Sequence, residues 1–185
     1  MIKLRELAHA ELGRVREIDR TELIEAIYYL EDGALVRKPE RYDMRRWPSG
    51  ALDGIEACLI DCHERGGWCA GAFDGQRLVG IVALESRWMG AEQDQLQLLL
   101  LHVSHGYRDR GLGARLFHAA RAMAAERGAR SLYVSATPSE HTVDFYLGVG
   151  CRLHPRPDPE LLAEEPEDIH LLCDVAAPLQ DTAPL

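Results

Sequence analysis

The pattern of apolar and polar positions predicts a chain in which strands and helices alternate. Strands are expected where apolar residues alternate with polar ones or run unbroken, and helices where apolar residues recur every three or four positions. The expected strands are residues 3–7, 68–73, 77–88, 95–103, 130–136 and 168–175, and the expected helices are residues 8–20, 50–65, 112–127 and 139–150. This order of elements predicts a mixed α/β sheet covered by helices.

Two Asp-Gly pairs indicate β-hairpins, because this dipeptide favours the tight turn that joins antiparallel strands. Asp74-Gly75 lies between two of the expected strands. Asp32-Gly33 lies within residues 24–44, between two runs of β-branched and aromatic residues. The second pair therefore predicts an irregular or hairpin insertion between the first two helices.

Other turn signals mark helix ends and connections. Ser49 is expected to cap the second helix, because its hydroxyl can accept a hydrogen bond from the first turn. Residues 154–168 form a proline-rich connector with one helical turn capped at Asp158. The tail, residues 176–185, has no periodicity and is expected to be loose.

The stretch HVSHGYRDRGLGARL, residues 102–116, joins an apolar strand to a helix through a charged turn with two glycines. A strand that enters a helix in this way exposes unpaired N–H groups at the positive end of the helix dipole. Gly111 and Gly113 permit close backbone approach, so the N–H groups from Arg110 to Ala114 can converge on one oxyanion. The turn therefore predicts a phosphate site. It lacks the Lys-Ser or Lys-Thr of a nucleoside-triphosphate loop and the third glycine of a dinucleotide turn.

Composition narrows the class of partner. Lys and Arg number 21 against 30 Asp and Glu, a formal net charge of −9, which argues against nucleic-acid binding and favours a cationic or amine-bearing partner. No stretch approaches the ~20 apolar residues of a membrane span, so no membrane contact is expected and the predicted location is cytoplasmic. The five cysteines lie mostly in apolar surroundings and are expected to be reduced thiols.

The glycine turn and the strand before it resemble the acyl-coenzyme A binding segment of the GNAT superfamily of N-acetyltransferases. That family has Arg or Gln, two residues, Gly, one residue, then Gly or Ala, after a strand that ends in an aliphatic, any residue and an aliphatic. Arg108, Gly111 and Gly113 occupy the turn positions, and Leu101 and Val103 occupy the strand end. The strand-to-helix context makes this match specific.

A second segment, SEHTVDFYLGVGCRL at residues 139–153, resembles the later helix of the same family. In that helix an aromatic-Tyr pair precedes a Gly and a strand. Phe145 and Tyr146 take the places of the pair, and Gly150-Cys151 stands where Gly-Phe is usual. The resemblance covers residues 68–153, and the N-terminal third matches only in the order of its elements.

The resemblance implies roles for individual residues. Acetyl-coenzyme A would be the co-substrate, with its pantetheine arm on the strand end and its pyrophosphate on the turn, and no metal is implied. Tyr146 would donate a proton to the thiolate that leaves when an amine attacks the thioester, since a phenol stays protonated at neutral pH. The residues implied to bind the cofactor are Leu101, Val103, Arg108, Arg110, Gly111, Leu112, Gly113, Ala114 and Ser139.

Two positions depart from the family's pattern. Ser139 stands where an Asn often bonds the coenzyme arm, so that contact would be shortened or lost. Gln97 stands four positions before Leu101, where some members carry a carboxylate base, and an amide cannot accept the proton. A general base would then be Glu85, Asp94, His102 or a chain of water molecules.

In this superfamily the segment between the first two helices generally helps to form the acceptor pocket. Its tyrosines and carboxylates would suit a cationic amine, although its aromatic residues are equally expected to pack on the sheet. The residues expected to bind the acceptor are Tyr28, Tyr29 and Glu85, with Asp19, Glu25, Glu31 and Trp47 as further candidates to line the pocket.

The sequence therefore predicts a GNAT-like mixed, mostly antiparallel sheet of six to seven strands flanked by helices, with strands 95–103 and 131–136 parallel and splayed at the cofactor site. One acetyltransferase domain is expected over residues 1–175. The expected reaction moves an acetyl group to a primary amine, of a small molecule rather than a protein, by direct attack in a ternary complex. The alternatives are a non-catalytic acyl-coenzyme A sensing module and an acetyltransferase acting on a protein amine. Exposed edge strands are compatible with a homodimer.

Overall fold

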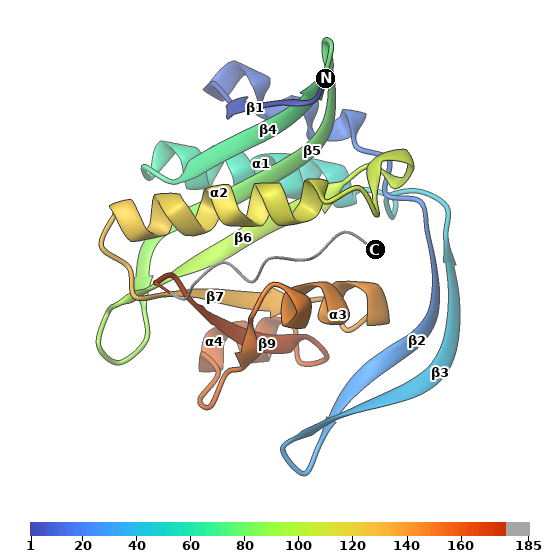
Figure 1. Ribbon diagram of the computed structural model, residues 1–185, viewed down its shortest axis with the longest axis vertical. Coiled ribbons are helices and arrows are strands. Elements are labelled where there is room, and N and C mark those ends of the chain that lie inside the picture. Colours follow the sequence, from blue (N-terminus) through green and yellow to red (C-terminus); the bar gives the residue numbers. More distant parts are fainter. Residues whose placement is uncertain (177–185) are drawn as a thin grey trace.

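The computed structural model describes residues 1–176, which form a seven-stranded sheet with helices on both faces and a separate two-stranded hairpin (Figure 1). The sheet has the order β1-β4-β5-β6-β7-β9-β8, and β2 and β3 form the hairpin. The strands are β1 (Lys3–Glu6), β2 (Glu22–Glu31), β3 (Ala34–Met44), β4 (Trp68–Asp74), β5 (Arg77–Met89), β6 (Gln95–Val103), β7 (Ser131–Ala136), β8 (Arg152–Leu153) and β9 (Ile169–Asp174). The helices are α1 (Ala51–Glu64), α2 (Leu112–Glu126), α3 (Glu140–Gly148) and α4 (Pro159–Glu164), with 3-10 helices η1 (His9–Glu17) and η2 (His105–Tyr107).

The predicted mixed, mostly antiparallel sheet is confirmed, and so are both hairpins. The β4–β5 turn has Gly75 at φ +59°, and the β2–β3 turn has Asp32 and Gly33 at φ +48° and +79°. Gly and Asp tolerate this left-handed region better than most residues, which explains why Asp-Gly pairs identified the turns. The tail expected over 176–185 lies outside the described residues apart from its first position.

Two predicted helix features are wrong in detail. The first helix is a 3-10 helix over nine residues, shorter than the amphipathic stretch that predicted it. Helix α1 begins at Ala51 after Gly50, which lies at φ +80°, and no side chain caps it. Ser49 therefore lies one position too early to act as the cap, because the left-handed glycine turns the chain into the helix.

The two faces of the sheet are covered by different helices (Figure 1). Helices α2 and α3 bury Leu116, Phe117 and Val143 in one core with Val82 of β5. Helices η1 and α1 contribute to a second core on the other face. The five cysteines are free thiols. No helix within residues 1–176 is long and apolar enough to cross a membrane.

Strands β6 and β7 run parallel and then separate, as predicted. They pair only from Gln95 with Ser131 to Gln97 with Tyr133, so the second half of β6 has no partner strand on that side among residues 1–176. On its other side β6 stays paired with β5. Leu99 of β6 has no partner on β5 and forms a bulge between the pairs of Leu98 and Leu100. A bulge of this kind bends a strand and increases its twist, which favours the separation.

The β2–β3 hairpin projects from the sheet, and α3 holds the middle of β2 (Figure 1). The Glu140 carboxylate is only 3% exposed and accepts 2.9 Å hydrogen bonds from the N–H groups of Glu25 and Ala26. The Tyr28 N–H also donates to the Pro138 carbonyl at 2.8 Å. Burial by itself would raise the pKa of Glu140, but these N–H donors outweigh burial and hold the pKa below its ordinary value. The hairpin is therefore fixed relative to α3.

Candidate active site

The turn between β6 and α2 presents unpaired backbone N–H groups. Gly111 lies at φ +70° immediately before the helix, and Asp109 also has a positive φ of 58°. The first helical hydrogen bond runs from the Arg115 N–H to the Gly111 carbonyl at 3.1 Å, so Leu112, Gly113 and Ala114 precede the first residue that can donate within the helix. These amides at the positive end of the helix dipole are suited to a phosphate oxygen.

Gly113 joins this turn to the predicted catalytic helix. A Cβ atom added at Gly113 would lie 3.2 Å from Cε2 of Phe145, so the absence of a side chain lets the start of α2 approach α3 closely. The rings of Phe145 and Tyr146 lie 5.1 Å apart, and Tyr146 also packs edge-on against Phe117 at 6.0 Å. The two sequence motifs therefore meet in one place.

The open edge of β6 supplies a second set of backbone groups. The Ser104 N–H donates to the Val79 carbonyl at 2.9 Å, toward β5. Because successive N–H groups along a strand point to opposite sides, those of Leu101 and Val103 point to the edge where β7 no longer pairs. This edge can accept an extended amide-containing chain such as a pantetheine arm.

Arg108 is turned inward, toward the end of β6. Its Nε donates to the Val103 carbonyl at 3.1 Å, its Nη1 lies 3.6 Å from Oε2 of Glu22, and its backbone N–H donates to the His105 carbonyl at 3.3 Å. Its side chain therefore positions the strand end, and the unpaired amides of the turn begin after it. A direct phosphate contact from Arg108 stays a prediction.

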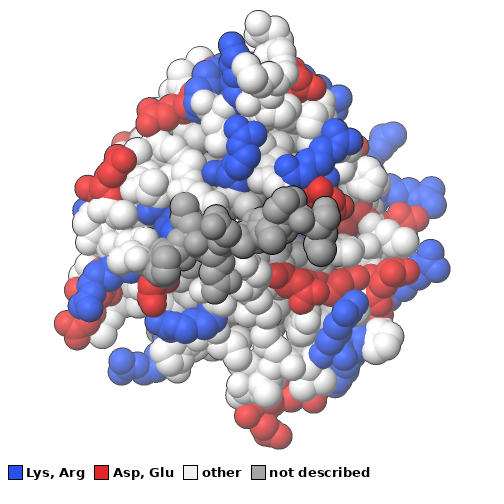
Figure 2. Space-filling view, in the orientation of Figure 1, with Lys and Arg blue, Asp and Glu red and all other residues white. Residues whose placement is uncertain are grey.

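Arg110 lines a cavity of about 260 Å³ beside the turn. Its guanidinium lies 5.9 Å from the centre of the Tyr107 ring, and the Tyr107 hydroxyl donates to Asp74 at 2.9 Å. Arg115, one helical turn after Gly111, lines the same cavity, and its place in the helical repeat is the signal that could have identified it. Figure 2 shows basic side chains over the part of this face where α2 begins and acidic side chains over α3.

Tyr146 has the environment that a proton donor requires. Its side chain is 6% exposed, and its hydroxyl makes no hydrogen bond with any residue in 1–176. Burial raises the pKa of Tyr146 above its ordinary value, so the phenol stays protonated at neutral pH. Its proton is thus available to a group bound next to the helix.

The hydroxyl of Ser139 is used within the protein. Ser139 is buried at the start of α3, where its Oγ accepts from the Thr142 N–H at 3.4 Å and donates to Oγ1 of Thr142 at 2.9 Å. These contacts cap the helix. Binding of the coenzyme arm by Ser139 remains a prediction.

The predicted base candidates lie in three different places. Glu85 is 4% exposed and pairs with Arg65 of the segment after α1 at 2.8 Å. Asp94 precedes the first residue of β6, at the opposite end from the glycine turn, and lies 3.8 Å from Arg130. His102 lies on β6 with its ring edge-on to Trp47 at 4.8 Å.

The pKa of His102 is lowered to about 3, first by burial and then by the nearby charges of Arg20 and Arg108. The imidazole is therefore neutral at physiological pH, and it is a weak base because its protonated form is so disfavoured.

This shift predicts a pH dependence of stability. Below the ordinary pKa of 6.5 the unfolded chain binds a proton at His102 that the folded protein does not bind, so acid lowers the free energy of unfolding. Between pH 7 and pH 5 the loss from this site is expected to be about 2 kcal/mol. Urea denaturation of the wild type and of His102→Gln at both pH values measures it. The variant should lose less stability, and an equal loss in both proteins would contradict the assignment.

The two predicted acceptor-binding tyrosines face opposite sides of the hairpin, as neighbours on a strand must. Tyr28 donates from its hydroxyl to Asp144 of α3 at 2.8 Å. Tyr29 donates to Glu40 and is 36% exposed. Glu31 pairs with Lys38 near the tip. The structure therefore places Tyr28 beside α3 and Tyr29 away from it.

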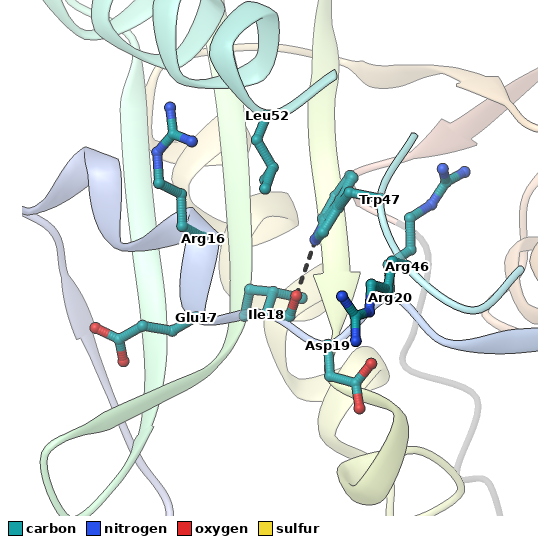
Figure 3. Close-up of a pocket in the computed structure, with 8 residues that line it drawn as sticks. All are labelled: Arg16, Glu17, Ile18, Asp19, Arg20, Arg46, Trp47 and Leu52. Atoms are coloured by element: carbon teal, nitrogen blue, oxygen red, sulfur yellow. Dashed lines mark hydrogen bonds between the residues drawn. The ribbon is translucent and has the colours of Figure 1, made fainter. Parts of the chain in front are cut away.

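A second cavity, of about 350 Å³, lies between the end of η1 and the segment that joins β3 to α1 (Figure 3). Asp19 and Trp47, both predicted to line an acceptor pocket, contribute to it. The indole Nε1 of Trp47 donates to the Ile18 carbonyl at 2.8 Å. Arg20, which the sequence did not single out, lies against Trp47 in the same cavity.

Comparison with known proteins defines the class. The model of the acetyltransferase (GNAT) family matches residues 25–150, so the chain belongs to the GNAT acetyltransferase family, as the motifs indicated. It is an acetyltransferase by fold and domain, and no curated protein matches it.

Three solved structures resemble the fold. Nourseothricin acetyltransferase is 16% identical, with a TM-score of 0.68 over 94% of this chain and 98% of its own. PaiA N-acetyltransferase from Thermoplasma acidophilum, in complex with coenzyme A, is 16% identical, with a TM-score of 0.62 over 94% and 99%. An aminoglycoside 6′-N-acetyltransferase complexed with coenzyme A is 15% identical, with a TM-score of 0.53 over 72% and 84%. Two of the three structures are described as complexes with coenzyme A.

Proposed function

We infer that the protein transfers an acetyl group from acetyl-coenzyme A to a primary amine of a small molecule, by direct attack in a ternary complex. The observation that carries this inference is the meeting of three features. They are the amides at the start of α2, the unpaired edge of β6, and the protonated Tyr146 beside them. Each matches a different part of the co-substrate: the pyrophosphate, the pantetheine arm and the sulfur.

The chain's own groups account for the steps of the transfer. The turn from Arg110 to Ala114 holds the pyrophosphate, and Leu101 and Val103 orient the arm so that the thioester lies where β6 and β7 separate. The amine nitrogen forms a bond to the thioester carbonyl carbon, and the carbon–sulfur bond then breaks. Tyr146 gives its proton to the departing thiolate. The amine loses its extra proton to water, and a proton from water returns to the Tyr146 phenolate.

A water acceptor for the amine proton follows from the surroundings of the other candidates. Glu85 is paired with Arg65, and His102 is too weak a base. Asp94 immediately precedes β6, at the end of the strand that is far from the glycine turn. Gln97 stands in the last register pair before the strands separate and can orient a water molecule through its amide without taking the proton.

The small-molecule acceptor is supported by two observations. The cavity beside Trp47 has a volume of about 350 Å³, within the range typical of small-ligand sites. Two of the similar structures are described as acting on nourseothricin and on aminoglycosides, which are small molecules. A single domain over residues 1–175, a cytoplasmic location and a homodimer belong to the same proposal.

The competing function is an acyl-coenzyme A binding module without turnover, which the amide at Gln97 favours. The test is release of free coenzyme A thiol from acetyl-coenzyme A by the purified protein across a panel of aminoglycosides, polyamines, amino acids and short peptides. Amine-dependent release supports the enzyme and names the acceptor class. No release of thiol with any amine of the panel, together with tight coenzyme A binding in a parallel titration, would favour the binding module.

A further inference from the structure

The cavity beside Trp47 contains a partly buried arginine, Arg20, that makes no ion pair with another residue of the described chain. The guanidinium of Arg20 lies 5.2 Å from the centre of the Trp47 ring, and within residues 1–176 it makes no hydrogen bond or ion pair. Figure 3 shows Arg20 and Arg46 together on one side of Trp47, with Arg16 on the other side. An arginine removed from water in this way is stabilised when an anion binds to it.

The other arginines of the cavity show that Arg20 is unusual. Arg16 is paired with Asp53 at 2.6 Å and Glu56 at 2.8 Å, so its charge is already balanced. Arg46 is exposed and, within the described chain, also makes no ion pair. Two guanidinium groups in one cavity are therefore available to a ligand.

The carboxylates near Arg20 do not neutralise it. Oδ1 of Asp19 accepts the Thr21 N–H at 3.0 Å, and the side chain of Asp19 is not within ion-pair distance of Arg20. The charge of Glu22 also acts on Arg20, but Glu22 lies closer to Arg108, at 3.6 Å, and is not within ion-pair distance of Arg20. Burial lowers the pKa of Arg20 from its ordinary value, but the group remains a cation at neutral pH.

The cavity adjoins the end of β6 that is predicted to hold the pantetheine arm. The Asp19 N–H donates to Oγ of Ser104 at 3.0 Å, and the Asp19 carbonyl accepts from the His105 N–H at 2.9 Å. The ring of Trp47 contacts His102 of the same strand. A molecule anchored at Arg20 therefore lies beside the strand along which the thioester is predicted to lie.

We propose that Arg20 binds a carboxylate of the acceptor, so that the protein acetylates amines that also carry a carboxylate. This inference rests on the proposed function and specifies its substrate class. The planar guanidinium forms two parallel hydrogen bonds to a carboxylate while its face stays on Trp47. Arg46 adds a second, more solvated charge.

The experiment compares amines that differ only in the carboxylate. Initial rates of thiol release are measured for ω-amino acids with one to six methylene groups and for n-alkylamines of the same chain lengths. For the chain length that fits, kcat/KM of the ω-amino acid is expected to exceed that of its alkylamine by about ten- to hundredfold, the effect of a charge-assisted hydrogen bond. Arg20→Gln should remove most of this preference.

The matched control is Arg45→Gln. Arg45 is exposed, pairs with Asp43 at 2.9 Å and does not line the cavity, so its loss should leave the preference intact. Binding is followed separately by quenching of tryptophan fluorescence during titration with the same ω-amino acids in the presence of coenzyme A. This second readout does not depend on turnover.

The outcomes separate the two proposals. The Arg20 assignment would be overturned if the protein acetylated ω-amino acids and alkylamines with equal kcat/KM, or if the preference for ω-amino acids survived Arg20→Gln. Either result would leave the proposed function standing. Fluorescence binding of ω-amino acids that Arg20→Gln abolishes, without turnover, would support the carboxylate site and contradict the acetyltransferase reaction proposed above. Absence of both binding and turnover with ω-amino acids would overturn the carboxylate site.

Discussion

Tyr146→Phe is expected to lower kcat by about two to three orders of magnitude, the contribution typical of a general acid. The substitution removes only the hydroxyl and keeps the ring contacts with Phe117 and Phe145. Because that hydroxyl makes no hydrogen bond with a described residue, the thermal midpoint should stay the same or rise slightly. Steady-state rates, coenzyme A titration and a thermal melt measure the three quantities on one preparation.

The matched control is Tyr42→Phe, which removes a hydroxyl from an exposed tyrosine on the hairpin that donates to Glu40 and should leave turnover unchanged. Since burial raises the pKa of Tyr146 above its ordinary value, loss of the acid should begin only above pH 10 in the wild type. Unchanged kcat in Tyr146→Phe, with coenzyme A affinity intact, would remove Tyr146 from the mechanism.

Gly111→Val is expected to weaken coenzyme A binding by at least tenfold. Gly111 lies at φ +70°, and the space around its Cβ position is open, so the effect comes from the backbone and not from a clash. A β-branched residue is strained in the left-handed region by about 1–3 kcal/mol. The chain would relieve that strain by turning the amides at the start of α2 away from their common centre. Isothermal titration with coenzyme A measures the loss.

The opposite end of the same helix supplies the control. Gly128 follows α2 at φ +92°, also with open space around its Cβ position, and it lies far along the helix from the phosphate turn. Gly128→Val should therefore destabilise the fold by a similar amount and leave coenzyme A affinity unchanged. Equal affinities in the two variants would contradict a phosphate site at Gly111, because general destabilisation alone would then explain both.

Strand β6 connects the two halves of the candidate site. The amides of its turn and the helix that carries Tyr146 lie on the face covered by α2 and α3, whereas the cavity with Arg20 and Trp47 is built from η1 and the segment before α1. An acceptor and a thioester can thus approach β6 from opposite faces and meet where it separates from β7. This arrangement suits direct attack in a ternary complex, since neither substrate has to leave for the other to enter.

The sequence alone predicted most strands, most helices and the glycine turn that leads into α2, because each depends on neighbouring residues. The two-residue strand β8 was not predicted. Periodicity of apolar positions located β4 to β7 to within a few residues. Positive φ angles at Gly75 and Gly111 are permitted by the absence of a Cβ atom, and the spacing of the two glycines at the start of α2 is a local property of the chain. Tyr146 was singled out by the motif of its own helix, and its role stays a prediction.

Only the tertiary structure decided which charged and polar groups meet. Arg108 turns inward to Val103 and Glu22, although the resemblance implied that it binds the cofactor. Glu140 binds the backbone of a hairpin more than a hundred residues away. Arg20 lies against Trp47 and makes no ion pair with a carboxylate of residues 1–176. Such contacts depend on how distant elements pack, and long charged side chains can reach many partners, so no local pattern in the sequence specifies them.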